Sequence, residues 1–273
     1  MGDEKAHWLA LSRIGGIGSV RFRLLLDTFG SIEGAWSASA ESLRACGLGP
    51  SAAKAWVEGR TQIDPQREVD RVRAAGYSVL TWLDAEYPER LRETAQPPPV
   101  LYVWGSLGER DRWAVAVVGT RRPSAYGVSV ARDLGRTLAG HGIVVVSGLA
   151  RGVDGIAHQA ALEAGGRSIA VLGSGLDQVY PPEHRPLAAR IAESGAVISD
   201  YSLGTRPEAA NFPPRNRIIS GLAAVIVIVE AGEGSGALIT ADFGAEQGRE
   251  VFAVPGSIYS RSSRGCLKLI ENG

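Results

Sequence analysis

The first part of the chain has apolar residues at helical spacing. Between Trp8 and about Val57 they recur at the interval that places them on one face of a helix. The segments IGGIG, FGS and GLGPS interrupt this pattern with the small residues typical of turns. The pattern predicts several short helices, and we expect residues 1–62 to form a small all-helical domain.

A mixed stretch follows the predicted helices. Pro65 favours the start of a helix over 64–74, because proline is well tolerated in a first helical turn. Residues 77–83 are apolar and β-branched enough to predict a strand, and the prolines at 97–99 indicate a connection. We expect residues 63–99 to be a linker region with a possible first strand.

From residue 100 onward, short β-branched apolar runs alternate with longer helical segments. Runs without polar alternation are typical of parallel strands that are covered on both faces. The sequence therefore predicts an α/β protein, in which an extended Rossmann-like parallel sheet over residues 100–273 follows the small all-helical N-terminal domain. The predicted strands are Ala114–Val118, Ile143–Ser147, Ser168–Leu172, Ala196–Ser199, Ala224–Val229 and Val251–Val254.

Composition narrows the class of protein. The chain has 273 residues, of which 45% are hydrophobic and 21% charged, so it predicts a folded globular protein. Lys plus Arg and Asp plus Glu both number 29, so a polyanion would have to bind a local cluster of cations. Cys46 and Cys266 form no CxxC motif, which disfavours disulfide and metal frameworks and favours a cytoplasmic location. No signal peptide or membrane-spanning run is expected.

Glycine-rich loops follow four of the predicted strands. In a parallel sheet such loops share one edge, and their backbone N–H groups are suited to bind anions at helix N-termini. We expect them to form a phosphate-binding site, although tight strand-to-helix turns alone also favour glycine. The candidate residues are Gly119, Thr120, Arg121 and Arg122, then Ser147, Gly148 and Arg151, then Gly173 and Gly175, and finally Gly234, Ser235 and Gly236.

The segment FPPRNR combines the side chains that single-stranded nucleic acids contact. Phe212 offers a ring on which any base stacks, Arg215 and Arg217 offer phosphate contacts, and Asn216 offers an amide. The alternative for Phe212 is a ring that fills the core. The segment predicts a nucleic-acid site beside the glycine-rich loops.

Signs of catalysis are weak. HExxH, GxSxG, GxxxxGK[ST] and CxxC motifs are all missing, which disfavours the usual hydrolase, ATPase and zinc chemistry. Asp154 and His158, four residues apart, fit metal ligands or an acid–base pair, but also a helix cap beside a packed histidine. We expect a protein that is not an enzyme, with no cofactor and no metal.

Several longer strings resemble the DNA-processing protein A (DprA/Smf) family. They include VGTRRPSAYG, VVSGLARGVDGIAHQAAL, FPPRNRIISGL and GSGALITADFGAEQGREVFAVPG. The resemblance implies a sterile-alpha-motif-like or helix-hairpin-helix N-terminal domain, and a Rossmann domain that binds single-stranded DNA, forms a homodimer and loads RecA during natural transformation. It also implies DNA contacts by Arg121, Arg151, Phe212, Arg215, Asn216 and Arg217.

Three further expectations depend on this resemblance. Many members end in a winged-helix-like domain, which we expect this chain to lack. The apolar tail predicts a dimer interface at Leu267 and Ile270. The alternative function is a nucleotide-binding enzyme similar to nucleoside monophosphate phosphoribohydrolases, whose PGGxGTxxE loop corresponds to AGEGSGALIT here. Ile239 then stands in the place of the catalytic glutamate, which disfavours hydrolysis.

Overall fold

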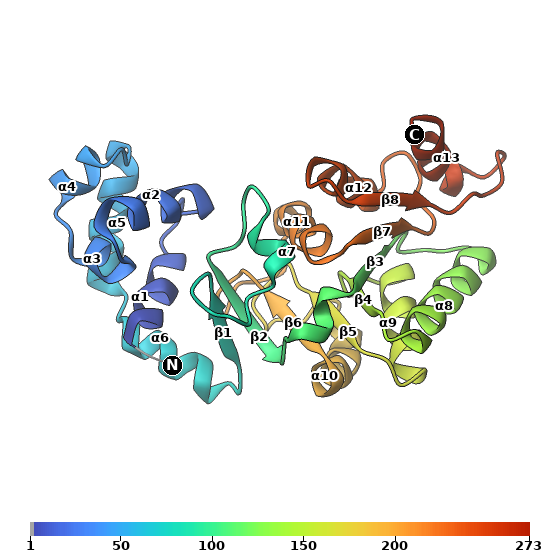
Figure 1. Cartoon of the computed structure of the whole chain (residues 1–273), viewed down its shortest axis with the longest axis horizontal. Coiled ribbons are helices and arrows are strands. Elements are labelled where there is room, and N and C mark those ends of the chain that lie inside the picture. Colours follow the sequence, from blue (N-terminus) through green and yellow to red (C-terminus); the bar gives the residue numbers. More distant parts are fainter. Residues whose placement is uncertain (1–2) are drawn as a thin grey trace.

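An eight-stranded sheet runs through the molecule (Figure 1). The computed structural model describes residues 3–273, with the side chains from residue 5 onward. The strand order is β1-β2-β6-β5-β4-β3-β7-β8, and all neighbouring pairs from β6 to β8 are parallel. This arrangement confirms the predicted Rossmann-like sheet. The strands are β1 Ser78–Thr81, β2 Val100–Gly105, β3 Ala114–Val118, β4 Val144–Ser147, β5 Ser168–Val171, β6 Ala196–Ser199, β7 Val225–Ile228 and β8 Glu250–Ala253.

Strand β2 is an addition to the predicted set. It pairs antiparallel with β1 on one side and with β6 on the other, so that Tyr102 lies opposite both Val79 and Ser199. The sequence pattern missed it because VLYVWG directly follows three prolines, and only the short helix Glu89–Arg92 lies between it and β1 in place of a full crossover helix. The sheet is therefore parallel except at this edge.

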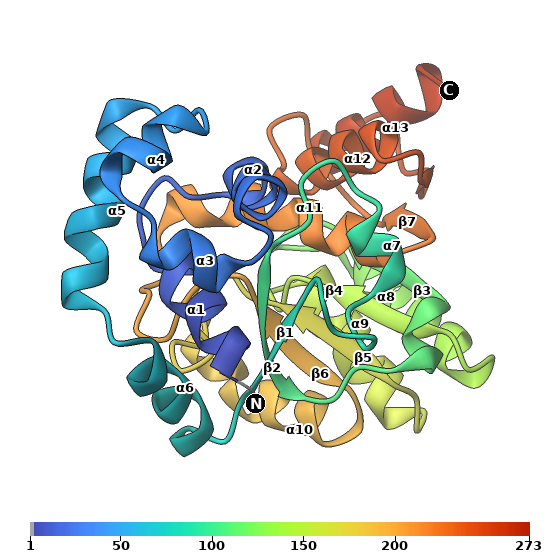
Figure 2. The ribbon, with the colours of Figure 1, turned by 60° about the vertical axis from the view of Figure 1, so that its left-hand side comes forward.

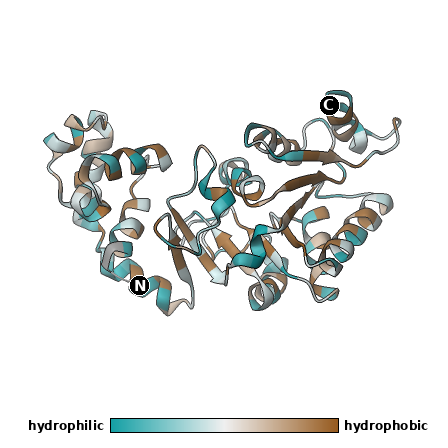
Figure 3. Ribbon diagram, in the orientation of Figure 1, coloured by the Kyte–Doolittle hydropathy of each residue, from teal (hydrophilic) through white to brown (hydrophobic). Residues whose placement is uncertain are grey.

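Helices cover both faces of the sheet, which explains why the central strands are apolar throughout (Figure 3). One face is covered by α8 Ala125–Gly140, α9 Val153–Glu163 and α10 Arg185–Ser194. The other face is covered by α7 Glu89–Arg92, α11 Phe212–Leu222, α12 Gly236–Glu246 and α13 Arg264–Glu271. Buried apolar clusters lie on both sides of the sheet.

The N-terminal helices lie beside β1 and β2 (Figure 2), and their apolar core continues into the sheet. Trp8 contacts Phe22 and Trp82, with ring centroids 5.4 and 5.6 Å away, and Tyr102 of β2 belongs to the same cluster. Residues 63–99, expected to be a linker, contribute a helix, a strand and buried residues to this core. The helices are α1 Asp3–Ser12, α2 Ser19–Phe29, α3 Ile32–Ser37, α4 Ala40–Ala45, α5 Pro50–Gln62 and α6 Pro65–Ala74.

The order of the strands creates a crevice between β3 and β7. The chain proceeds from β3 through β4 and β5 to β6 in one direction, and then returns to place β7 and β8 on the opposite side of β3. The helices that follow β3 and β7 cover opposite faces, so their loops diverge at the carboxyl ends of these strands. Ligands bind at such a crossing point in open parallel sheets.

None of the helices within residues 3–273 combines the length and the apolar character needed to cross a bilayer.

Val69→Ala tests whether the segment before residue 100 belongs to the core. Val69 of α6 is 1% exposed, whereas Val20 of α2 is 69% exposed. We expect Val69→Ala to lower the free energy of unfolding by about 2 kcal/mol, because a buried valine loses its apolar contacts. The matched Val20→Ala should change it by less than about 0.5 kcal/mol. Urea denaturation measures both, and equal effects would contradict the shared core.

Candidate nucleic-acid interface

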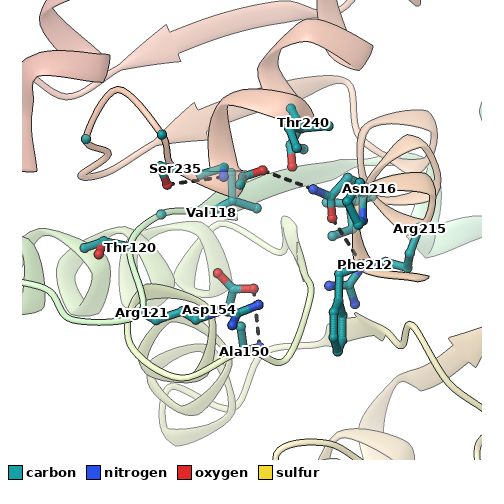
Figure 4. Close-up of a pocket in the computed structure, with 18 of the residues that line it drawn as sticks. Val118, Thr120, Arg121, Ala150, Asp154, Phe212, Arg215, Asn216, Ser235 and Thr240 are labelled. Carbon is teal, nitrogen blue, oxygen red and sulfur yellow. Dashed lines mark hydrogen bonds between the residues drawn. The ribbon is translucent and has the colours of Figure 1, made fainter. Parts of the chain in front are cut away.

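A cavity of about 870 Å³ opens at the crevice between β3 and β7 (Figure 4). We call it the β3–β7 pocket. Its walls come from the loops after these strands, from the first turns of α11 and α12, and from the loop before α13. The predicted residues that line it are Gly119, Thr120, Arg121, Arg122, Phe212, Arg215, Asn216, Gly234, Ser235 and Gly236.

Two arginines at this pocket have no acidic partner within residues 3–273. Arg121 and Arg122 are both exposed, and neither takes part in an ion pair there. The guanidinium of Arg121 lies 5.7 Å from the centre of the Phe212 ring, which itself packs against Tyr180 with 5.9 Å between centroids. The half-buried Phe212 therefore presents an aromatic surface directly beside an unpaired cation.

Arg215 is buried behind the pocket, where it helps to hold the walls together, and we call the buried residues with this role the frame of the pocket. Its side chain donates hydrogen bonds to the carbonyl oxygens of Gly148, at 3.0 Å, and Val171. Burial lowers the pKa of this guanidinium to about 10, while Asp154 and Asp200 oppose the shift, so it stays charged at neutral pH. The charge ties α11 to the ends of β4 and β5.

Asp154 completes this frame. Its carboxylate accepts backbone hydrogen bonds from Gly148 at 3.0 Å and from Ala150 at 3.4 Å (Figure 4). Burial raises the pKa of this carboxyl, and the Arg215 charge together with the two N–H groups opposes the rise. For Asp154 these contacts favour a capping role, at the loop that leads into α9, over the roles of metal ligand or acid–base group. His158 instead bonds Ser168 Oγ through Nδ1 at 2.7 Å.

The start of α12 forms the opposite side of the frame. Asn216 Nδ2 donates to the carbonyl oxygen of Gly236 at 3.1 Å, and Ser235 Oγ accepts from the N–H of Ala237 at 3.3 Å (Figure 4). A Cβ added at Gly234 or Gly236 would meet no atom within 4 Å. Protein packing therefore does not require glycine at these two positions, and the free space faces the pocket.

Other predicted glycines are close-packed against the protein itself. A Cβ at Gly148 would lie 2.6 Å from Arg215 Nη2, and one at Gly173 would lie 2.9 Å from the Phe212 ring. A Cβ at Gly175 would lie 2.7 Å from a carbonyl oxygen, that of Ser202. Packing within the protein therefore requires glycine at these three positions, and none of the three opens toward the pocket.

Two predicted side chains point elsewhere. Ser147 is fully buried and its hydroxyl donates to the carbonyl oxygen of Val117 at 2.6 Å. Arg217 forms an ion pair with Asp200 at 2.7 Å and donates to the carbonyl oxygen of Gln96, on the other side of α11. Two residues along a helix correspond to a turn of about 200°, so Arg215 and Arg217 face opposite sides. Arg217 therefore holds the fold and does not line the pocket.

Arg151 lines a smaller cavity beside the β3–β7 pocket, and the two cavities share Arg121 and Phe212. Its Nε is 2.5 Å from Glu183 Oε1, and both side chains are about half exposed, at 50% and 51%. Its guanidinium lies 5.9 Å from the centre of the Tyr180 ring. Exposed ion pairs contribute little stability, so a phosphate group can replace Glu183 as the partner.

Among the residues that line the pocket, the sequence pattern missed Tyr180, Arg261 and Ser262. Tyr180, after β5, extends the aromatic surface of Phe212. Arg261 and Ser262 come from the loop after β8. The run SRSSRG, polar and placed between the last strand and the last helix, was the available signal for these two. Within residues 3–273, no group of three or more His, Cys, Asp or Glu side chains is arranged to hold a metal ion.

Comparison with known proteins agrees with this architecture. Residues 78–273 match the family model of DNA recombination-mediator protein A. The chain belongs to this family. The match begins at β1, so the family region includes the antiparallel edge of the sheet as well as the parallel strands.

Relatives in the family cover much of the chain. Protein Smf of Synechocystis is 40% identical over 99% of this chain, and the DNA processing protein DprA of Bacillus subtilis is 41% identical over 74% of it. These matches span 69% and 68% of the two relatives, so the chain corresponds to about two thirds of their length.

Two solved structures share the fold. DNA processing protein A from Streptococcus pneumoniae is 33% identical, with a TM-score of 0.84 over 100% of this chain and 93% of that one. The protein from Helicobacter pylori, described for its single-stranded DNA binding mode, is 32% identical, with a TM-score of 0.64 over 72% of this chain and 88% of that one.

Arg215→Ala and Arg121→Ala separate the buried frame of the pocket from its exposed lining. We expect Arg215→Ala to lower the free energy of unfolding by about 3–5 kcal/mol, because it leaves the buried Asp154 without its cation. Arg121→Ala removes an exposed side chain and should change it by less than about 0.5 kcal/mol. Chemical denaturation at neutral pH measures both values. Similar losses in the two variants would contradict this division.

Proposed function

We propose that this protein binds single-stranded DNA in the β3–β7 pocket as a non-enzymatic recombination mediator in the cytoplasm. In this role it protects incoming DNA and loads RecA during natural transformation. The observation that carries the proposal is the unpaired Arg121 beside the half-exposed ring of Phe212. Membership in the recombination-mediator family, and the DNA-binding mode named for the Helicobacter pylori protein, support it.

The form of the pocket favours a single strand over a duplex. Duplex grooves are read by convex elements such as a helix, whereas this site is a cavity whose aromatic surface requires an unstacked base. Phe212 and Tyr180 offer that surface, while Arg121 and Arg122 offer phosphate contacts. The open backbone at Gly234 and Gly236, beside the first turn of α12, suits another phosphate.

The enzymatic alternative has little support in the pocket. Ile239, which stands in the place of the phosphoribohydrolase glutamate, lines the cavity with an aliphatic side chain that transfers no proton. Asp154 also lines it, but backbone N–H groups and the Arg215 charge already engage its carboxylate. We therefore favour binding without hydrolysis.

A homodimer is the second part of the proposal. Strand β8 is the edge of the sheet, and large apolar side chains lie exposed on and after it: Phe252 is 56% exposed, Ile258 68% and Tyr259 91%. On α13, Ile270 is 50% exposed and Leu267 is partly exposed. An unpaired edge beside exposed apolar groups favours association with a second copy.

Arg121→Ala tests the assigned DNA site. We expect weaker binding of labelled oligo-dT, and a plot of log affinity against log salt that is shallower by about 0.7, because one phosphate contact is lost. Arg132→Ala is the control, since Arg132 is exposed on α8 outside the pocket. Equal affinity and slope in Arg121→Ala and the parent would place the site elsewhere.

The same titration tests the class of ligand. We expect unlabelled oligo-dT to displace the probe at lower concentrations than a duplex of equal length or AMP. Stronger competition by AMP would favour the mononucleotide-binding alternative.

Ile270→Asp tests the dimer. We expect the parent to have a dimeric mass by light scattering at tens of micromolar, and Ile270→Asp to shift it toward the monomer, because burying an unpaired carboxylate is unfavourable. Val20→Asp, at an exposed valine on α2, should leave the mass unchanged. A monomeric parent would contradict the proposal.

A further inference from the structure

The loop between β8 and α13 forms one wall of the β3–β7 pocket. We call residues 255–263 the C-terminal strap. Just before the strap, the N–H of Val254 donates to the carbonyl oxygen of Ile228 at 2.9 Å. Just after it, the N–H of Gly265 donates to the carbonyl oxygen of Ala231 at 2.8 Å. Both ends are thus anchored along β7 and the residues after it, while Arg261 and Ser262 reach the pocket.

A buried carboxylate ties the strap to the first arginine loop. Glu230 is 5% exposed. Its Oε2 accepts hydrogen bonds from the N–H and the hydroxyl of Ser124, at 2.9 and 3.1 Å, and its Oε1 accepts one from the Ser262 hydroxyl. Ser124 directly follows the loop that carries Arg121 and Arg122 and caps α8. One side chain therefore connects two walls of the pocket.

The first turn of α8 provides two more contacts for this connection. The Tyr126 hydroxyl donates to the carbonyl oxygen of Pro255 at 3.0 Å, which holds the beginning of the strap. Gly127 leaves room for the carboxylate, because a Cβ there would lie 2.1 Å from Glu230 Oε2. The strap is therefore held at Pro255 by α8 and at Ser262 by Glu230, which in turn bonds the N-cap of α8.

The strap places one more unpaired cation at the pocket. Arg261 is exposed, and its guanidinium has no hydrogen bond or ion pair with the part of the chain that the structure describes. It shares this condition with Arg121 and Arg122. The negative charge of a buried acid at the same site would weaken the binding of a phosphate. Attraction to a phosphate therefore does not explain why Glu230 lies there.

We propose that Arg261 is a further phosphate contact of the β3–β7 pocket and that Glu230 is a positioning residue that holds the strap for it. This inference rests on the proposed binding of single-stranded DNA. It adds to that function a contact from the end of the chain, which the buried carboxylate joins to the loop after β3.

Arg261→Ala tests the contact. We expect oligo-dT to bind several-fold more weakly, with a salt slope shallower by about 0.7. Arg264→Ala, at an exposed arginine three residues later and outside the pocket, should bind like the parent. Arg121→Ala in the same assay separates the two ideas. If it weakens binding and Arg261→Ala does not, the contact is wrong and the proposed function stands; if neither weakens binding, the proposed function is wrong.

Glu230→Gln tests the positioning role by the sign of its effect. Charge alone predicts tighter binding after this substitution, whereas loss of the strap position predicts weaker binding and a shallower salt slope. Tyr126→Phe removes the other tether without changing any charge, and it decides the question if Glu230→Gln does not fold. In the Arg261→Ala background neither substitution should lower affinity further. Tighter binding by Glu230→Gln, or equal losses in both backgrounds, would overturn the role.

Discussion

The buried charge of Arg215 holds together the parts from which the site is built. A guanidinium removed from water is strongly unfavourable unless polar groups surround it, and here the carbonyl oxygens of Gly148 and Val171 accept its hydrogen bonds while the charge of Asp154 stabilises it. These partners come from the loop after β4, the end of β5 and the start of α9. Because α11 carries the charge, its first turn is fixed relative to all three. Phe212, three residues earlier on the same side of the helix, is thereby held at the pocket.

This arrangement gives a chain with no net charge a local cluster of cations. Some of its arginines serve the fold, with Arg215 and Arg217 each satisfied by acids or carbonyl oxygens. Others are left unpaired at the cavity, namely Arg121, Arg122 and Arg261. The balance of 29 basic and 29 acidic residues therefore conceals a local excess of positive charge. A field of this kind is short-ranged in physiological salt.

The glycines of the four loops divide in the same way. At Gly148 and Gly173 the missing side chain makes room for other protein groups, the Arg215 guanidinium and the Phe212 ring. At Gly234 and Gly236 it leaves open space beside the first turn of α12. Only the second kind gives a ligand direct access to backbone N–H groups, although both kinds look alike in the sequence.

The sequence by itself determined the parallel strands and the edge of the sheet at which the glycine-rich loops meet. Strands buried on both faces need unbroken apolar runs, and the loops after them must share one edge. Tertiary structure alone decided which residues meet there. Arg121 lies over Phe212, 91 positions later in the chain, because the strand order places β3 beside β7. The 100° step of the helix separates Arg215 from Arg217 within one motif. Arg261 joins the site because hydrogen bonds between residues far apart in sequence hold its loop to α8 and to Glu230, and no local pattern encodes such contacts.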